Sequence, residues 1–219
     1  CMDAAADNYD ASANVDDGNC SICSSIEFDD YTYSVVEIGD QCWFAENLRT
    51  TVYADDSSIP EVTGSSAWTG LSTGARCDYN NDAANVATYG RLYNWYAVTD
   101  AAGLCPNGWH VPTHGEWTAL EDYITAQGFN GTEGTALMST SGWNSGNGTD
   151  DFGFSALPGG NRYVYGNFSN AGYVGYWWSS SPSGGDAWAR YLLYSDPDIY
   201  RDLYGPRRGF SVRCLRDAA

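Results

Sequence analysis

The chain has 219 residues, of which 43% are hydrophobic, and 28 acidic residues outweigh 10 basic ones to give a formal net charge of −18. A field of this sign repels phosphate backbones and anionic lipid headgroups, so it argues against nucleic-acid binding and polybasic membrane attachment and favours bound cations. No apolar run reaches the roughly 20 residues of a membrane span, so we expect no transmembrane segment. Seven Cys without a paired C-x-x-C zinc pattern indicate disulfides, an oxidising compartment and an exported protein.

Residues 1–20 differ from the rest of the chain because they begin and end with Cys and contain almost no large apolar side chain. Such a segment cannot build a core, so a disulfide and a bound ion would have to replace one. Calcium prefers six to eight oxygen ligands from a flexible loop. The sequence therefore predicts a calcium site, with calcium as the cofactor. The alternative is a solvated acidic loop held only by the disulfide. The predicted ligands are Asp3, Asn8, Asp10, Asp16 and Asp17.

The odd number of Cys leaves two arrangements open at the N-terminal end. In the first, Cys1 pairs with Cys20, and Cys23 is either a free thiol or bonded to another chain. In the second, Cys1 is a lipidated N-terminus and Cys20 pairs with Cys23. We favour the first arrangement because Cys1 lies inside the Asp-rich pattern rather than before a flexible tether.

Residues 21–25 are predicted to be a linker, and strand-like patterns begin at Ile26. Residues 50–86 are polar and form a long surface excursion, while 89–98 carry large apolar side chains at helical spacing. The clearest helix starts at Thr113, where the sequence Thr-His-Gly-Glu fits a capping box, and is expected to end at Gly128.

In the second half of the chain, side chains alternate with the period of two that is typical of strands, in short segments separated by turn residues. Residues 142–151 form a Gly-rich loop. With one or two helices before it and antiparallel strands after it, residues 26–219 are expected to form a single α+β domain. The predicted strands are 162–165, 173–179, 187–194, 199–203 and 209–215.

Several strings in this region resemble one known family. IGDQCWFAENL (38–48), YGRLYNWYAV (89–98), LCPNGWHVPTHGEWTAL (104–120), GYWWSSS (175–181) and YGPRRGFSVRCLRD (204–217) are similar, in the same order, to the Fibrobacter succinogenes major paralogous domain. The resemblance runs from about residue 28 to 217. It implies an exported, loop-rich protein with a C-type-lectin-like, formylglycine-generating-enzyme-like fold. Residues 1–20 resemble the calcium-type repeat of secreted bacterial adhesins and fibre proteins.

The resemblance also bears on the remaining Cys residues. Lectin-like folds join the ends of their domain by a disulfide, which implies that Cys105 pairs with Cys214. That pairing leaves Cys42 to bond Cys77 and so to hold the long excursion in place. Formylglycine-generating enzymes need a reactive Cys pair close in sequence near their C-terminal end, and Cys214 has no such neighbour. No G-x-S-x-G motif is present either, so we expect no enzymatic activity.

The loop at 142–151 is a second cation candidate, because a comparable region of sugar-binding C-type lectins holds calcium. Its oxygen-bearing side chains are Asn144, Asn147, Asp150 and Asp151. The chain lacks the Glu-Pro-Asn or Gln-Pro-Asp string of those lectins. We therefore favour a structural loop held by Asx-turn hydrogen bonds over a ligand loop.

The two histidines, His110 and His114, are four residues apart, which superficially suggests zinc. Because the helix cap lies between them, they cannot share a helix face, and we expect His110 to be a packed residue bonded to the backbone.

Exposed aromatic side chains are the last candidates, since Tyr and Trp give rigid contact area with a polar handle. Most aromatics must form the core of a chain with so few Leu, Ile and Met. Those expected to bind a ligand or partner are Tyr163, Tyr165, Phe168 and Tyr173.

Together these features predict a non-enzymatic extracellular or cell-surface protein that acts in adhesion or assembly, including as a subunit of an extracellular fibre. Its partners would be other copies of itself, in head-to-tail contacts, or other cell-surface proteins. The alternative is a carbohydrate-binding lectin-like module, monomeric or lipid-anchored, whose partners are glycans.

Overall fold

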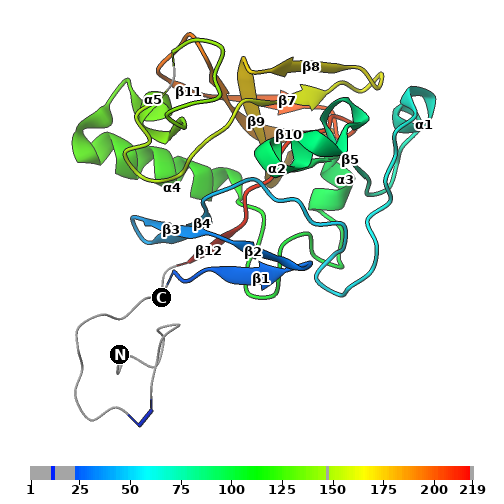
Figure 1. Ribbon diagram of the computed structural model, residues 1–219, viewed down its shortest axis with the longest axis horizontal. Helices are drawn as coiled ribbons and strands as arrows, with labels where there is room; N and C mark the ends of the chain where they lie inside the picture. The colour runs from blue at the N-terminus through cyan, green and yellow to red at the C-terminus, as the bar shows by residue number, and fades with distance from the viewer. Residues whose placement is uncertain (1–10, 13–22, 147, 218–219) are drawn as a thin grey trace.

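The computed structural model describes residues 11–12, 23–146 and 148–217, and Figure 1 shows their arrangement. The predicted calcium ligands, the predicted Cys1–Cys20 disulfide and Asn147 lie outside these residues. The strands are β1 (Ile26–Phe28), β2 (Tyr31–Tyr33), β3 (Val35–Ile38), β4 (Gln41–Phe44), β5 (Arg76–Cys77), β6 (Leu92–Tyr93), β7 (Gly159–Arg162), β8 (Phe168–Ala171), β9 (Val174–Ser183), β10 (Asp186–Leu193), β11 (Ile199–Tyr204) and β12 (Leu215–Asp217). The helices are α1 (Ser65–Thr69), α2 (Val86–Tyr89), α3 (Trp95–Val98), α4 (His114–Ile124) and α5 (Glu133–Leu137), with the short turns η1 (Tyr79–Asn81), η2 (Ala83–Asn85) and η3 (Thr125–Phe129).

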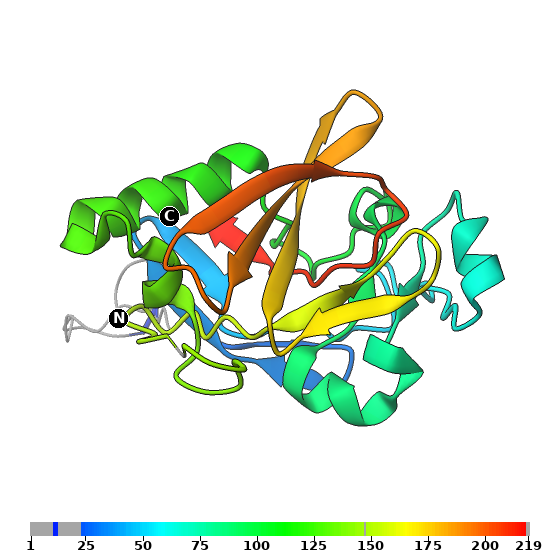
Figure 2. The ribbon, with the colours of Figure 1, turned by 90° about the horizontal axis from the view of Figure 1, so that it is seen from above.

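The larger sheet has five strands in the order β11-β10-β9-β7-β8, and the smaller one has three in the order β12-β4-β3. The strands pair antiparallel except at the short β7–β9 contact, where Gly160 lies opposite Gly175. Figure 2 shows the larger sheet from above, with the β9–β10 hairpin extending beyond the other strands. Short helices and mainly antiparallel strands confirm the predicted α+β class.

Helix α4 lies between the two sheets, as Figure 1 shows. Thr113 accepts the Glu116 N–H, and the Glu116 carboxylate accepts the Thr113 N–H, which confirms the predicted capping box. Trp117, Leu120 and Ile124 face the core, where Trp43 of β4 and Trp177 of β9 also pack. The helix widens after Ile124 into η3 and turns at Gly128, whose φ of 101° favours glycine.

The region between residues 89 and 98 contains a strand and a short helix rather than the single predicted helix. Leu92 and Tyr93 pair with β5, and the Asn94 side chain then caps α3 by accepting the Ala97 N–H. Its amide also donates to the Thr73 carbonyl, and its oxygen accepts the Ala75 N–H. The prediction failed because large apolar side chains at helical spacing also fit a buried strand followed by one helical turn.

The predicted strand at 209–215 is mostly an irregular segment. Single bridges join Phe210 to Tyr93 and Ser211 to Trp177, and only the last residue, Leu215, belongs to β12. The segment nevertheless lies at the centre of the molecule, since Phe210, Val212 and Cys214 are all fully buried.

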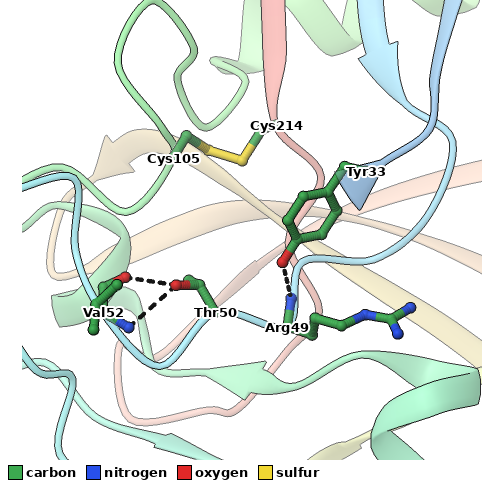
Figure 3. The surroundings of a disulfide bond; sticks show 6 residues. All are labelled: Tyr33, Arg49, Thr50, Val52, Cys105 and Cys214. Carbon is green, nitrogen blue, oxygen red and sulfur yellow. Dashed lines mark hydrogen bonds between the residues drawn. A yellow bond between two sulfur atoms is a disulfide. The ribbon is translucent and has the colours of Figure 1, made fainter. Parts of the chain in front are cut away.

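The disulfides correct two of our predictions. Cys23 bonds Cys42, so Cys23 is neither free nor linked to another chain, and Cys42 does not bond Cys77. Cys77 is a buried free thiol, and burial raises its pKa to about 12. The Cys105–Cys214 disulfide is present, as the resemblance implied. Figure 3 shows it near Tyr33, whose hydroxyl accepts the Arg49 N–H at 3.0 Å.

Arg162 anchors the long polar surface segment, residues 50–86, that we expected a Cys42–Cys77 disulfide to hold. Its guanidinium is fully buried and donates to the carbonyls of Val62 and Thr63. The same group lies over the Trp68 ring, 4.3 Å from its centroid, and so joins α1 to the larger sheet. Hydrogen bonds and a cation–π contact therefore replace the covalent link.

A second buried arginine joins the two sheets. Arg213 donates to Asn47 Oδ1 at 2.8 Å and to the carbonyls of Phe44, Phe154 and Ser155. Trp177 of β9 donates to the same Asn47 oxygen at 2.8 Å. Burial lowers the pKa of Arg213 to about 9, and no carboxylate of the described residues forms an ion pair with it.

Candidate functional site

Tyrosine side chains line up across the three outer strands of the larger sheet. In the antiparallel register, Tyr191 of β10 lies opposite Tyr176 of β9 and opposite Tyr200 of β11. Residues directly opposite in antiparallel strands project from the same face of a sheet. The three side chains therefore form a row, and each of them is half-buried.

Ring contacts hold this row together. Tyr191 stacks on Tyr200 with centroids 5.2 Å apart, and Tyr176 lies 5.7 Å from Tyr191. The buried Phe210 stacks beneath Tyr176 at 4.8 Å, and Tyr204 packs perpendicular to both of these rings. A platform supported from below by a fully buried ring is rigid, and rigid aromatic side chains lose little entropy on binding.

One arginine completes the platform. The Arg208 guanidinium lies 4.4 Å from the Tyr163 centroid and 5.0 Å from that of Tyr204. We call these five tyrosines together with Arg208 the tyrosine face; its members are Tyr163, Tyr176, Tyr191, Tyr200, Tyr204 and Arg208. Among the ion pairs of the described residues, none involves Arg208.

Four hydroxyl groups of this face, those of Tyr176, Tyr191, Tyr200 and Tyr204, stay protonated at neutral pH. Burial is the main cause that raises the pKa of Tyr176, Tyr191 and Tyr204. A hydrogen bond to Asp196, followed by burial, raises the pKa of Tyr200 to about 12. The face therefore offers phenolic O–H groups and one guanidinium that can donate hydrogen bonds to an acidic or hydroxylated partner, except for the Tyr200 hydroxyl, which donates to Asp196.

Side chains hinder the pairing of a further strand at both edges of this sheet, β11 and β8. In β11 the Leu203 N–H donates to Asp202 Oδ1 at 2.8 Å, and in β8 the Ala171 N–H donates to the Tyr79 hydroxyl at 3.4 Å. Side chains that bond a backbone N–H of an outer strand, together with charge on that strand, oppose the addition of another strand. These contacts oppose the addition of a further strand at β11 and at β8.

The four aromatic side chains predicted from sequence do not form one site. Tyr163 belongs to the tyrosine face, and Tyr165 is 74% exposed. Phe168 packs against Tyr79, while Tyr173 is 44% exposed with its ring against Tyr194. Sequence reasoning missed Tyr176, Tyr191, Tyr200 and Tyr204. Their alternation was visible, but only the register between strands shows that they meet.

The side chains and backbone of the second cation candidate, the loop at 142–151, form hydrogen bonds with other groups of the protein. Asp150 accepts both the N–H and the hydroxyl of Ser155 at 2.6 Å, and Asp151 accepts the Thr149 hydroxyl. The Asn144 N–H donates to the Gly172 carbonyl at 2.7 Å. These contacts fit the structural loop that we favoured. Within residues 23–146 and 148–217, no three His, Cys, Asp or Glu side chains are grouped as a metal site requires.

The histidines have separate partners. His110 Nε2 lies 2.7 Å from Glu116 Oε1, so it contacts a carboxylate rather than the backbone as we predicted. His114 packs against Trp188 and lies 3.1 Å from the buried Arg190, and burial together with Arg190 lowers its pKa.

An acidic hollow lies on the α4 side of β11. It encloses about 260 Å³ and is lined by residues that include Glu121, Asp122, Glu133 and Asp198. Two of these carboxylates already have partners, because Glu121 pairs with Arg190 and Glu133 accepts the Thr125 hydroxyl and the Gly131 N–H. The hollow is thus built largely from structural ion pairs and caps.

The structure is an α+β domain cross-linked by two disulfides, with a row of tyrosine side chains on one face of its larger sheet. Residues 36–216 match the family model of the Fibrobacter succinogenes major domain. The chain therefore belongs to this family. Comparison with curated proteins gave no match, and neither did comparison with solved structures. None of the helices in the described part of the chain has the length and hydropathy needed to cross a bilayer.

Proposed function

We propose that this protein is a non-enzymatic, extracellular or cell-surface module for adhesion or assembly, and that it binds its partner through the tyrosine face. The observation that carries the proposal is the half-exposed row Tyr176–Tyr191–Tyr200, supported by Phe210 and flanked by an arginine without an ion pair. Tyrosine and arginine are the residues on which binding energy concentrates at protein interfaces. The two disulfides support an oxidising, extracellular location.

Head-to-tail contact between copies, including in an extracellular fibre, is the form of assembly we propose. Cys23 is bonded within the chain and does not link copies, so we propose that a noncovalent surface carries the contact. The resemblance to exported members of the family also supports a C-type-lectin-like classification of the domain.

Self-association measured by sedimentation velocity tests the proposal. The wild-type chain should form oligomers in a concentration-dependent manner, and Tyr191→Ser with Tyr200→Ser should make it monomeric. Tyr165→Ser is the matched control, since this ring is more exposed but stands outside the face. An unchanged distribution of oligomers in the double variant would refute the role of the face.

Calcium remains part of the proposal, through Asp3, Asn8, Asp10, Asp16 and Asp17. Four of these side chains are carboxylates within fifteen residues, and they repel one another unless a cation neutralises them. Calorimetric titration of the full chain with calcium should show one saturable site, and removal of calcium by EDTA should lower the melting temperature. A melting temperature indifferent to EDTA would argue for the solvated loop instead.

A carbohydrate ligand is the second candidate function. Tyr165 and Tyr173 are the most exposed aromatic side chains among the described residues, and a free aromatic face can stack on a sugar ring. Binding to a glycan array by a chain that sediments as a monomer would favour this function over assembly.

A further inference from the structure

The two histidines near the start of α4 are bound in chemically opposite ways. His114 Nδ1 lies 3.1 Å from the Arg190 guanidinium. An arginine can only donate a hydrogen bond, so Nδ1 must accept it through an unprotonated lone pair, and the neutral ring carries its proton on Nε2. His110 Nε2 lies 2.7 Å from Glu116 Oε1, and an ionised carboxylate only accepts, so this bond is compatible with a neutral or a charged ring. Protonation therefore breaks the contact of His114 and preserves that of His110.

The partner of His114 is a buried arginine that joins α4 to the larger sheet. Arg190 of β10 is 1% exposed, and its guanidinium donates to the Glu121 carboxylate. It also donates to the Thr118 hydroxyl at 3.1 Å and to the His114 carbonyl at 3.4 Å. The three helix residues follow one another at the spacing that places side chains on one face of a helix. One side chain of β10 thus binds this face of α4 from its first turn onward.

The charges that surround His114 disfavour a proton on its ring. Arg201 of β11 lies directly opposite Arg190 in the antiparallel register, so both side chains project from the α4 side of the sheet. Glu121 is the carboxylate that pairs with Arg190, and among the ion pairs of the described residues none involves Arg201. Burial, followed by the charges of Arg190 and Arg201, lowers the pKa of His114. The ring is therefore neutral at pH 7.

The other charged side chains of the adjoining strands lie elsewhere. On β10, Asp186 lies beside the Gly205 backbone. On β11, Asp202 follows Arg201 directly and so projects from the opposite face of the sheet. The sequence of β9 contains no charged residue. His114 therefore faces two arginines of the sheet, one of which is neutralised by Glu121.

From these contacts we propose that the His114–Arg190 hydrogen bond is an acid-sensitive latch between α4 and β10, which is intact while His114 is neutral and breaks when the ring takes up a proton from solvent. A proton on Nδ1 places one N–H group against another and adds a second positive charge beside a buried guanidinium. The folded state thus loses a hydrogen bond on protonation, whereas the unfolded chain accepts the same proton freely. This device is separate from the tyrosine face, which lies on the other side of the sheet.

The latch makes the stability of the fold depend on pH in a defined window. In the unfolded chain a histidine titrates at about pH 6.5, and the pKa of His114 in the folded protein is lower. Between these two values the unfolded state binds more protons. The contribution of the latch is therefore complete above about pH 6.5 and is lost as the pH falls toward the folded-state pKa. Carboxylates titrate at about pH 4, which is below this window.

Urea unfolding of two histidine variants tests the proposal. His114→Asn keeps an uncharged oxygen near the position of Nδ1, and so keeps an acceptor for Arg190 that does not titrate. Between pH 7.5 and pH 5.5, the unfolding constant of the wild-type chain should rise about fivefold more than that of His114→Asn, because one proton changes this constant by at most about tenfold per pH unit. His110→Gln is the matched control, since it replaces the other histidine of the chain and should retain the wild-type rise.

Nitrogen-15 NMR of the wild-type chain tests the latch without a substitution. At pH 7.5 the His114 ring should carry its proton on Nε2, and on acidification the side-chain N–H signals of Arg190 should shift with the midpoint of His114. The proposal is overturned if His114 titrates at or above the pKa of an unfolded histidine, or if the Arg190 signals do not respond to that titration. It is also overturned if a folded His114→Asn variant loses as much stability on acidification as the wild type.

Discussion

Arginine is used in two different ways in this molecule. In the core, Arg213 is fully buried and each of its bonded nitrogens donates to a carbonyl or amide oxygen. On the tyrosine face, Arg208 is half-buried, lies against two rings and has no ion pair with a described carboxylate. A buried polar group whose hydrogen bonds are all formed helps to specify the fold. A cation that packs on aromatic rings and has no ion pair can instead bind a carboxylate of a partner. Changes in the core should therefore alter stability, and changes on the face should alter binding.

The largest effect should follow from removing the Cys105–Cys214 disulfide. It spans a sequence separation of 109 residues, against 19 for Cys23–Cys42. The chain-entropy model then predicts a loss of about 4.8 kcal/mol for Cys105→Ala with Cys214→Ala and about 3.2 kcal/mol for Cys23→Ala with Cys42→Ala. Urea unfolding of the two double variants measures both values, and equal losses would contradict this ranking.

Replacing the buried arginine should cost nearly as much. Arg213→Met keeps most of the side-chain volume but removes the Arg213 donor from three backbone carbonyls and one of the two donors from Asn47 Oδ1, which keeps only Trp177. We expect a loss of about 3–5 kcal/mol in the free energy of unfolding. Arg201→Met, at an exposed arginine, should change it by no more than about 0.5 kcal/mol. A similar small effect at Arg213 would break the contrast between the two uses of arginine.

Alkaline pH should destabilise the fold through its buried tyrosines. Burial raises the pKa of Tyr53 to about 12 and raises that of Tyr93 well above its usual value, whereas both side chains titrate near pH 10 in the unfolded chain. Their contribution to stability is fully present below pH 10 and is lost as the pH rises toward the folded-state values. Because burial lowers the pKa of Arg213, the contribution of this one group to stability rises with pH. The several tyrosines should outweigh it.

The measurement is urea unfolding at pH 9 and pH 11.5, with tyrosinate absorbance followed in the native state. We expect lower stability at pH 11.5 and incomplete ionisation of tyrosine in the folded protein. Full ionisation near pH 10 without unfolding would contradict the burial of these rings.

The smallest effect should come from the helix cap. Thr113→Ala removes the hydroxyl that accepts the Glu116 N–H and should cost about 1 kcal/mol. Thr69→Ala, whose exposed hydroxyl donates to the Ser65 carbonyl in α1, is the control and should cost less. The Thr113→Ala change should not alter self-association, because α4 packs on the other side of the larger sheet from the tyrosine face.

The sequence predicted local features better than distant ones. The cap at Thr113, the end of the helix at Gly128 and the period-two strand at Ala187–Tyr194 depend on neighbouring residues, and the structure confirms them within a few positions. The pairing of Cys42 depends on which strands meet, and there the prediction of Cys77 as its partner was wrong.

The tyrosine face was only partly predictable for the same reason. Tyr163 was identified from composition, but Tyr191 and Tyr200 become neighbours only through the register of β10 and β11. Buried arginines could not be predicted either, since a side chain that is usually exposed gives no sequence signal of burial.

Hydroxyl-radical footprinting of the assembled chain tests the central claim most directly, because it reports which tyrosines a partner covers. The account predicts that Tyr176, Tyr191, Tyr200 and Tyr204 become protected relative to the monomer. Tyr123, which is 37% exposed on α4, should remain reactive in both states. Protection of Tyr123 with unchanged reactivity of the tyrosine face would contradict the account.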